Sequence, residues 1–225
     1  MSAPWFERDP AAYRALERLL RARHPTLHAF IENGECRLRG TYAAIDGDRY
    51  ALEIALPANY PRSLPDVWET GGRIPREIDR HVFPASGALC LGVPLALWIA
   101  MKGDFSVDRM LDYPIRGFLV GNSLVEQGEP WPHGDRSHGA AGILEHFGEF
   151  VGTADPMMVG SLLVNLLEHK VRGHWLCPCG SGRIIRKCHR EAVETLRQAP
   201  PSMLTHALET IVKNLKHRRE MSAAA

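Results

Sequence analysis

Two stretches of alternating apolar and polar residues, joined by a tight turn, constrain the fold of this chain more than any other feature. The first runs from Cys36 to Tyr42 and the second from Tyr50 to Leu56, with Asp46-Gly47 between them. A period of two places every second side chain on one face of a β-strand, and Asp-Gly is typical of hairpin turns. The sequence therefore predicts an antiparallel hairpin with one buried face, which also makes Cys36 a core residue.

The flanking segments extend this hairpin into an α+β fold. Before it, Asp9-Pro10 supplies an N-cap and a first-turn proline, and apolar residues then recur at helical spacing as far as Arg23. After it, Tyr60-Pro61 ends the second strand because proline cannot donate to a ladder, and Asp66–Thr70 supplies a third strand. We therefore expect an N-terminal helix followed by an antiparallel meander.

An irregular stretch follows the meander. No period persists from Arg73 to Val93, and long irregular segments in compact domains are more often functional than idle. Cys90 lies near the end of this stretch, where it is a candidate nucleophile; the alternative is a buried structural thiol. Helical spacing of apolar residues returns at 107–119, with a bend near Pro114, and again at 140–150.

The order of these parts carries a family resemblance. Tyr60-Pro61 is followed by Pro65 and Val67, Gly87-x-x-Cys90-Leu91 comes later, and Trp98 lies eight residues beyond the cysteine. Over roughly residues 8 to 152, this arrangement resembles the ubiquitin-conjugating enzyme (UBC) fold. The resemblance implies that Cys90 is a thioester-forming nucleophile on a shallow shelf and that Trp98 packs beneath it.

One motif of that family is changed here. The family usually carries His-Pro-Asn upstream of the cysteine, and this chain has His81-Val82-Phe83-Pro84. Without the asparagine, the oxyanion must be stabilised by another group, for which His81, Ser86 and the polar segment 131–139 are candidates.

The polar segment resembles one found in bacterial members of the conjugating-enzyme superfamily, including stand-alone enzymes encoded with anti-phage CBASS systems. Within it, His133 and Asp135 are candidates for deprotonating an incoming amine. The alternative is an ordered loop whose histidines cap helix ends or bond backbone carbonyls.

A conjugating-type cysteine needs partners. Its thiolate takes an acyl group from a thioester and yields it to an amine, so no nucleotide is required, and no Gly-x-x-x-x-Gly-Lys loop is present. The resemblance implies a ubiquitin-activating-like enzyme as donor, with a ubiquitin-like protein or the C-terminus of a CD-NTase, a nucleotide-second-messenger synthase, as cargo. The alternative from another class is a non-catalytic scaffold of the same fold with a silent Cys90.

The string from Cys177 to His189 predicts a metal site. Three of the five cysteines of the chain fall here, and Cys177, Cys179, Cys188 and His189 offer three soft thiolates and an imidazole, a set suited to tetrahedral Zn²⁺. Four protein ligands leave no place for water, so the site is expected to be structural. The string closely resembles the SEC-C zinc motif; a disulfide or redox pair is the alternative.

The C-terminal part is expected to be a helical tail, giving a UBC-like domain at 1–154 and a tail at 155–225 that contains the motif at 177–189. From residue 170 onward, 11 Lys/Arg face 4 Asp/Glu, a net charge of +7, whereas the rest of the chain carries −6. The basic tail indicates an anionic partner such as RNA or an acidic protein, or else solvated helix faces. The resemblance to SEC-C implies docking to protein partners, ribosomes or RNA; the alternative is a knuckle that only fastens the tail to the body.

The sequence also predicts a location. No run of about 18 apolar residues is present, and the first residues lack the features of a secretory signal. We therefore expect a cytoplasmic protein without a membrane contact.

Overall fold

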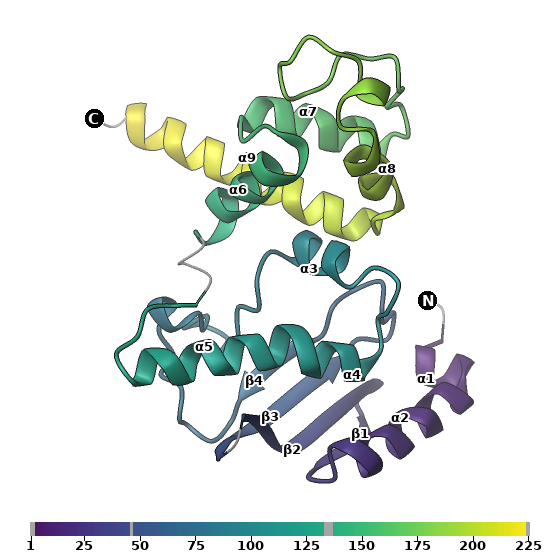
Figure 1. The fold of residues 1–225 in the computed structure, drawn as a ribbon, viewed down its shortest axis with the longest axis vertical. Coiled ribbons are helices and arrows are strands. Elements are labelled where there is room, and N and C mark those ends of the chain that lie inside the picture. Colours follow the sequence, from purple (N-terminus) through teal and green to yellow (C-terminus); the bar gives the residue numbers. More distant parts are fainter. Residues whose placement is uncertain (1–2, 46, 133–136, 224–225) are drawn as a thin grey trace. The chain divides into compact units, whose positions relative to one another are not determined.

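The computed structural model describes residues 3–45, 47–132 and 137–223. Its contacts divide the chain into two compact units, one formed by Met1–Gly92 with Met101–Gly134 and the other by Val93–Ala100 with Asp135–Ala225 (Figure 1). The first unit contains the sheet, and the second consists of helices and the Cys/His segment. The expected α+β class is therefore confirmed.

The first unit begins with two helices and a meander. Its N-terminal elements are α1 (Trp5–Arg8), α2 (Pro10–Arg23), β1 (Leu27–Glu32), β2 (Glu35–Ile45), β3 (Asp48–Leu56) and β4 (Asp66–Glu69). The Asp9 carboxylate caps α2 by accepting from the backbone N–H groups of Ala11 and Ala12. The strands pair antiparallel in the order β1-β2-β3-β4. The predicted hairpin is β2–β3 and the predicted third strand is β4, whereas β1 was not predicted.

Helices cover the buried face of this sheet. They are α4 (Val107–Met110), the π-helical turn η2 (Leu111–Ile115) and α5 (Arg116–Glu126), and the turn contains Pro114 at the predicted bend. Two buried tyrosines of the sheet donate hydrogen bonds to this layer, Tyr42 to the Leu111 carbonyl at 3.0 Å and Tyr50 to the Leu119 carbonyl at 3.2 Å. Cys36 is fully buried, as the alternation predicted.

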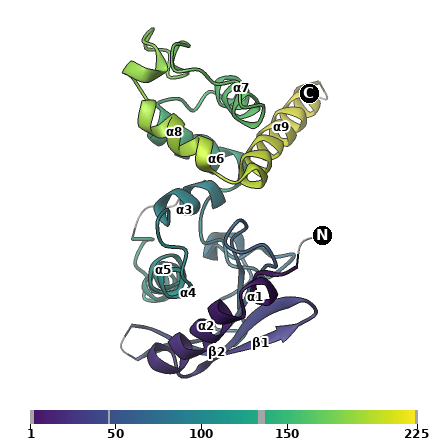
Figure 2. The ribbon, with the colours of Figure 1, turned by 90° about the vertical axis from the view of Figure 1, so that its right-hand side faces the viewer.

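The second unit is helical. Its elements are α3 (Pro94–Ala100), α6 (Gly139–Val151), α7 (Pro156–Leu167), the 3-10 turn η3 (Ile185–Lys187), α8 (Arg190–Gln198) and α9 (Pro201–Ala223), seen from a second side in Figure 2. The Asp155 carboxylate caps α7 by accepting from the N–H groups of Met157 and Met158.

The predicted domain boundary at residue 154 falls inside this second unit. α6 belongs with the C-terminal helices because its apolar face, which includes Phe147 and Val151, is fully buried and the helix contacts α7, α8 and α9. α3, which carries the buried Trp98, contacts α9.

Among the described residues, no single helix is both long enough and apolar enough to cross a membrane. α6 and α7 satisfy the length and composition criteria only as a pair that bends by 76° at its break.

Candidate functional site

Cys90 follows a short bridged loop at the end of the irregular stretch. Val82 and Leu89 form an isolated antiparallel bridge, the Phe83 N–H donates to the Ala88 carbonyl at 2.9 Å, and the Gly87 N–H closes the turn onto Phe83. The Cys90 N–H then donates to the His81 carbonyl at 2.7 Å. These bonds fix the backbone of Cys90 and leave its side chain half-buried, neither enclosed in the core nor fully in solvent.

His81 is a sequence-predicted residue that lies close to Cys90. A nitrogen of its ring lies within 4.8 Å of the Cys90 sulfur. The backbone at His81 is left-handed, with φ of 53°, and its ring meets the Trp131 ring edge-on at 4.6 Å between centroids. Trp131 in turn packs on α5 so closely that a Cβ at Gly121 would lie 2.3 Å from its ring. The position of His81 is therefore set by packing as well as by the backbone.

Burial governs the acidity of Cys90. Loss of water around the sulfur raises the pKa of the thiol, and a hydrogen bond from the Gly92 N–H opposes that rise only in part. At neutral pH the side chain is therefore chiefly a thiol, and its attack on an acyl group needs a neighbouring proton acceptor.

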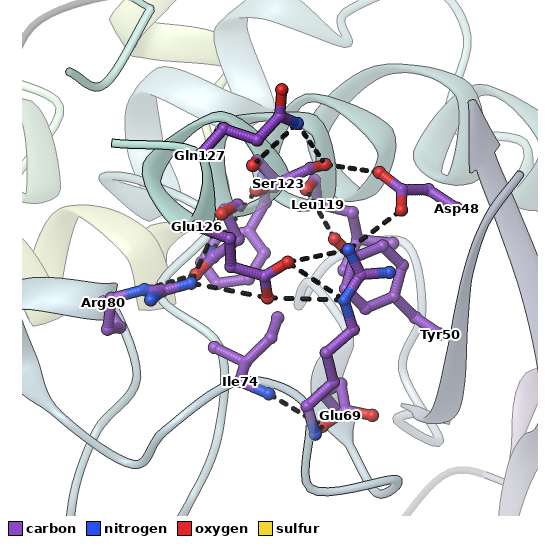
Figure 3. Close-up of polar contacts among 12 residues, drawn as sticks. Asp48, Tyr50, Glu69, Ile74, Arg80, Leu119, Ser123, Glu126 and Gln127 are labelled. Carbon is purple, nitrogen blue, oxygen red and sulfur yellow. Dashed lines mark hydrogen bonds and ion pairs between the residues drawn. The ribbon is translucent and has the colours of Figure 1, made fainter. Parts of the chain in front are cut away.

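A polar network ties the segment before His81 to α5 (Figure 3). The Arg73 guanidinium donates to Glu126 at 2.7 Å and to Asp48 at 2.9 Å, and it also lies over the Tyr50 ring. Asp48 accepts a further hydrogen bond from Ser123. This network holds the start of the irregular stretch against β3 and α5.

The same helix also holds the end of that stretch. Arg80 Nε donates to Asn122 Oδ1 at 3.0 Å, and its Nη2 donates to the Asn122 carbonyl at 3.3 Å. Asn122 is fully buried. Since Arg80 immediately precedes His81, this contact limits the freedom of the His81–Cys90 pair. Sequence reasoning missed Arg80 and Asn122, because no periodicity or motif marks either residue.

The remaining candidates for the Cys90 chemistry are placed differently. Ser86 uses its hydroxyl locally, accepting from the Ala88 N–H at 3.2 Å, so it serves the bridged loop. His133 and Asp135 lie outside the described residues.

The four predicted metal ligands do come together. The Cys177, Cys179 and Cys188 sulfurs and a His189 ring nitrogen lie within 4.8 Å of one another. Hydrogen bonds between backbone groups fold the segment into a knuckle, in which the Cys177 N–H donates to the Arg183 carbonyl at 2.8 Å. The group of side chains is one that could bind a metal ion.

The separations of these atoms fit a tetrahedral ion. Metal–sulfur bonds of about 2.3 Å and metal–nitrogen bonds of about 2.0 Å at tetrahedral angles require about 3.8 Å between sulfurs and about 3.5 Å between sulfur and nitrogen. Cys179 and Cys188 sulfurs are 3.6 Å apart, and His189 Nδ1 lies 3.3 Å from Cys177 and 3.4 Å from Cys188. These three separations are close to those of a tetrahedral metal site, and all four ligand atoms lie within 4.8 Å of one another.

Polar neighbours surround the ligand sulfurs. The Ser181 hydroxyl lies 3.2 Å from the Cys179 sulfur and 3.4 Å from the Cys188 sulfur, and it lowers the pKa of both thiols. Arg183 lowers the pKa of Cys188 further, whereas burial raises that of Cys177 to about 11. These contacts favour thiolates at two of the three sulfurs, which is the form that binds metal.

Comparison with known proteins finds no matching family model, no matching curated protein and no matching solved structure. The resemblances predicted from the motifs therefore rest on the residues and the geometry described above.

Proposed function

We propose that this chain is a ubiquitin-conjugating-type acyltransferase in which Cys90 carries the acyl group and a zinc knuckle at 177–189 is structural. The observation that carries the proposal is the surroundings of Cys90. Its backbone is fixed by the His81 carbonyl, its side chain is half-buried, and the His81 ring lies within 4.8 Å of its sulfur, all on an α+β meander of the expected order.

In the proposed reaction, the Cys90 sulfur attacks the carbonyl carbon of a thioester on an activating enzyme. A new carbon–sulfur bond forms, the old one breaks, and the departing thiolate takes up the proton that Cys90 releases. An amine of the target then attacks the acyl-Cys90 carbonyl and loses its own proton as the Cys90 thiolate leaves. His81 is the group placed to move these protons at the sulfur, in agreement with the raised pKa of the thiol.

The proposed partners follow from this chemistry. The acyl donor is a ubiquitin-activating-like enzyme that consumes ATP, because this reaction begins from an existing thioester. The proposed cargo is a ubiquitin-like protein or the C-terminus of a CD-NTase, with anti-phage defence as the setting.

A small peptide thioester of mercaptoethanesulfonate tests the transfer step without the activating enzyme. We expect intact-mass spectra to show one peptide on the wild-type protein as an adduct that added thiol removes, no adduct on Cys90→Ala, and an unchanged adduct on the control Cys36→Ala. His81→Gln should form the adduct more slowly at pH 7, with the difference narrowing at high pH. Equal labelling of wild-type and Cys90→Ala would reject Cys90 as the acyl carrier.

Zinc is the proposed ion of the knuckle, because three thiolates and one imidazole with a closed ligand set match its preferences. When bound, it would supply folding energy to a segment too short to bury a core. Metal analysis of the purified protein should give one zinc per chain, reduced to near zero in Cys188→Ala and unchanged in Cys36→Ala. A metal-free wild-type protein would reject the site.

The basic tail supports a proposed partner as well. From 169 to 190 the chain contains no acidic residue, and among the described contacts none of Arg172, Arg186, Lys187 or Arg190 pairs with a carboxylate. Trp175 is 38% exposed beside them. We propose RNA or an acidic protein as the ligand of this surface. RNA binding should weaken steeply as salt rises, and the variant Arg186→Gln should reduce that salt dependence.

A non-catalytic scaffold is the second candidate function. The raised pKa of Cys90, caused by burial, favours it, because a protonated thiol is a weak nucleophile. This candidate predicts that the peptide thioester leaves Cys90 unmodified at every pH at which the protein is folded.

A further inference from the structure

Arg183 contacts the candidate metal centre in two ways. Its backbone carbonyl accepts from the Cys177 N–H at 2.8 Å, and its Nη2 lies 3.2 Å from the Cys188 sulfur. The side chain therefore reaches back across the knuckle to a ligand sulfur five residues further along the chain.

The net charge of the metal centre determines what the contact between Arg183 and Cys188 does. Three thiolates and a neutral imidazole around a divalent ion carry a net charge of −1. The Arg183 guanidinium is permanently positive and brings that local charge to zero. Hydrogen bonds to a thiolate also withdraw electron density from sulfur, which makes it a poorer nucleophile and a poorer target for oxidants.

We propose that Arg183 is a positioning residue of the metal centre, which holds Cys188 on the ion and protects it from oxidation. The proposal rests on the proposed zinc. Cys179 and Cys188 are both partly exposed, whereas Cys177 is buried, and of the two exposed ligands it is Cys188 that Arg183 contacts. Ser181 contacts the same sulfur, but a hydroxyl brings no charge.

A second arginine in the knuckle, Arg186, provides a control for substitutions of Arg183. Arg186 has the same side chain, lies within η3 between the paired ligands, and donates to no ligand sulfur among the described contacts. Its side chain is exposed like that of Arg183. Arg186→Gln thus removes the same charge from the same segment without removing the contact to sulfur.

The experiment loads full-length protein with zinc and follows zinc release into a chromogenic chelator, with and without hydrogen peroxide. Partners in the outer shell of a metal site typically change metal affinity by about 10–100-fold. We expect Arg183→Gln to release zinc at least about 10-fold faster under peroxide, Arg183→Lys to be intermediate, and Arg186→Gln to match the wild type. Equal release from Arg183→Gln and Arg186→Gln would overturn the proposal.

Two further outcomes keep this proposal separate from that of the zinc itself. A wild-type protein without zinc rejects the proposed metal, whatever Arg183 does. If Arg183→Gln retains no zinc at purification, the zinc content of Arg183→Lys provides the test, because lysine keeps the positive charge. Zinc retained by Arg183→Lys supports the proposal. Complete loss of zinc from Arg183→Lys rejects a role for charge.

Discussion

Asn122 is the residue whose removal should most loosen the candidate site. It is fully buried, accepts from Arg80, and donates to the Phe118 carbonyl one turn earlier on α5. Its loss removes the partner of Arg80 Nε, and leaves Nη2 with the backbone carbonyl of residue 122 at 3.3 Å and with Glu126 at 3.7 Å. Because an unpaired buried polar group is costly, the residue before His81 is expected to become less ordered.

We predict that Asn122→Ala lowers the free energy of unfolding by about 1–3 kcal/mol and slows adduct formation at Cys90. Asn165→Ala is the control: Asn165 donates to the carbonyl one turn earlier on α7 in the same way, but it is only partly buried and accepts from no arginine among the described contacts. Asn165→Ala should lower the free energy of unfolding by less than about 0.5 kcal/mol. Urea denaturation of both variants gives the comparison, and equal costs would contradict the account.

At the scale of elements, the end of α6 is fitted to the metal knuckle. Gly152 caps this helix with φ of +75°, and a Cβ there would lie 2.9 Å from the His189 ring and 3.1 Å from the Cys179 Cβ. The helix end and the ligand residues are thus in contact with no room for a methyl group.

Gly152→Ala is therefore predicted to weaken zinc binding as well as stability. Gly34→Ala is the control, because Gly34 has the same φ of +75° and no atom within 4 Å of a Cβ. The backbone strain alone should cost about 1 kcal/mol in both variants. Competition with a zinc chelator should show weaker affinity in Gly152→Ala alone; unchanged affinity would mean that α6 and the knuckle are independent.

The sequence predicted those elements that carry their own local signals. The β2–β3 hairpin has alternation and α2 has a cap. The four metal ligands lie within 13 residues of chain, so their meeting needs little tertiary information. β1 was missed because it is an edge strand whose exposed Phe30 and Ile31 break the alternation. The contacts of Arg73 and Arg80 with Asp48, Asn122 and Glu126 join residues 25 to 53 positions apart, which no local pattern records.

The grouping of α6 with the C-terminal helices was missed for the same reason. The predicted boundary at 154 followed the reach of the family resemblance, roughly residues 8 to 152, which does not record which compact unit a helix joins. α6 groups with the C-terminal helices because Phe147 and Val151 are buried in a shared core. This burial depends on tertiary packing, which the local sequence does not show.

At the scale of the whole molecule, the network in Figure 3 links stability to pH. Ser123 and Arg73 lower the pKa of Asp48 below its ordinary value of 3.8. A carboxyl group with a depressed folded-state pKa contributes stability that is fully present above its unfolded-state pKa, and this contribution is lost as pH falls through the folded-state value.

The difference in unfolding free energy between wild type and Asp48→Asn is therefore predicted to be largest at pH 6–7 and to shrink below about pH 4. Urea titrations of both proteins across this range measure it. Asp66→Asn is a useful contrast, because burial raises the pKa of Asp66. The ionised Asp66 carboxylate therefore lowers the free energy of unfolding, whereas the ionised Asp48 carboxylate raises it. A difference for Asp48 that does not vary with pH would show that its partners do not act through charge.

The account depends most on the claim that Cys90 carries an acyl group in the cell. The most direct test is the intact mass of the protein from its native host, lysed in acid with N-ethylmaleimide and analysed with and without dithiothreitol. We predict a species heavier by one small protein, which dithiothreitol removes by thioester exchange, and which is absent from Cys90→Ala but present in Cys36→Ala. Cells with an active conjugation system in which wild-type and Cys90→Ala proteins give the same set of masses would contradict the account.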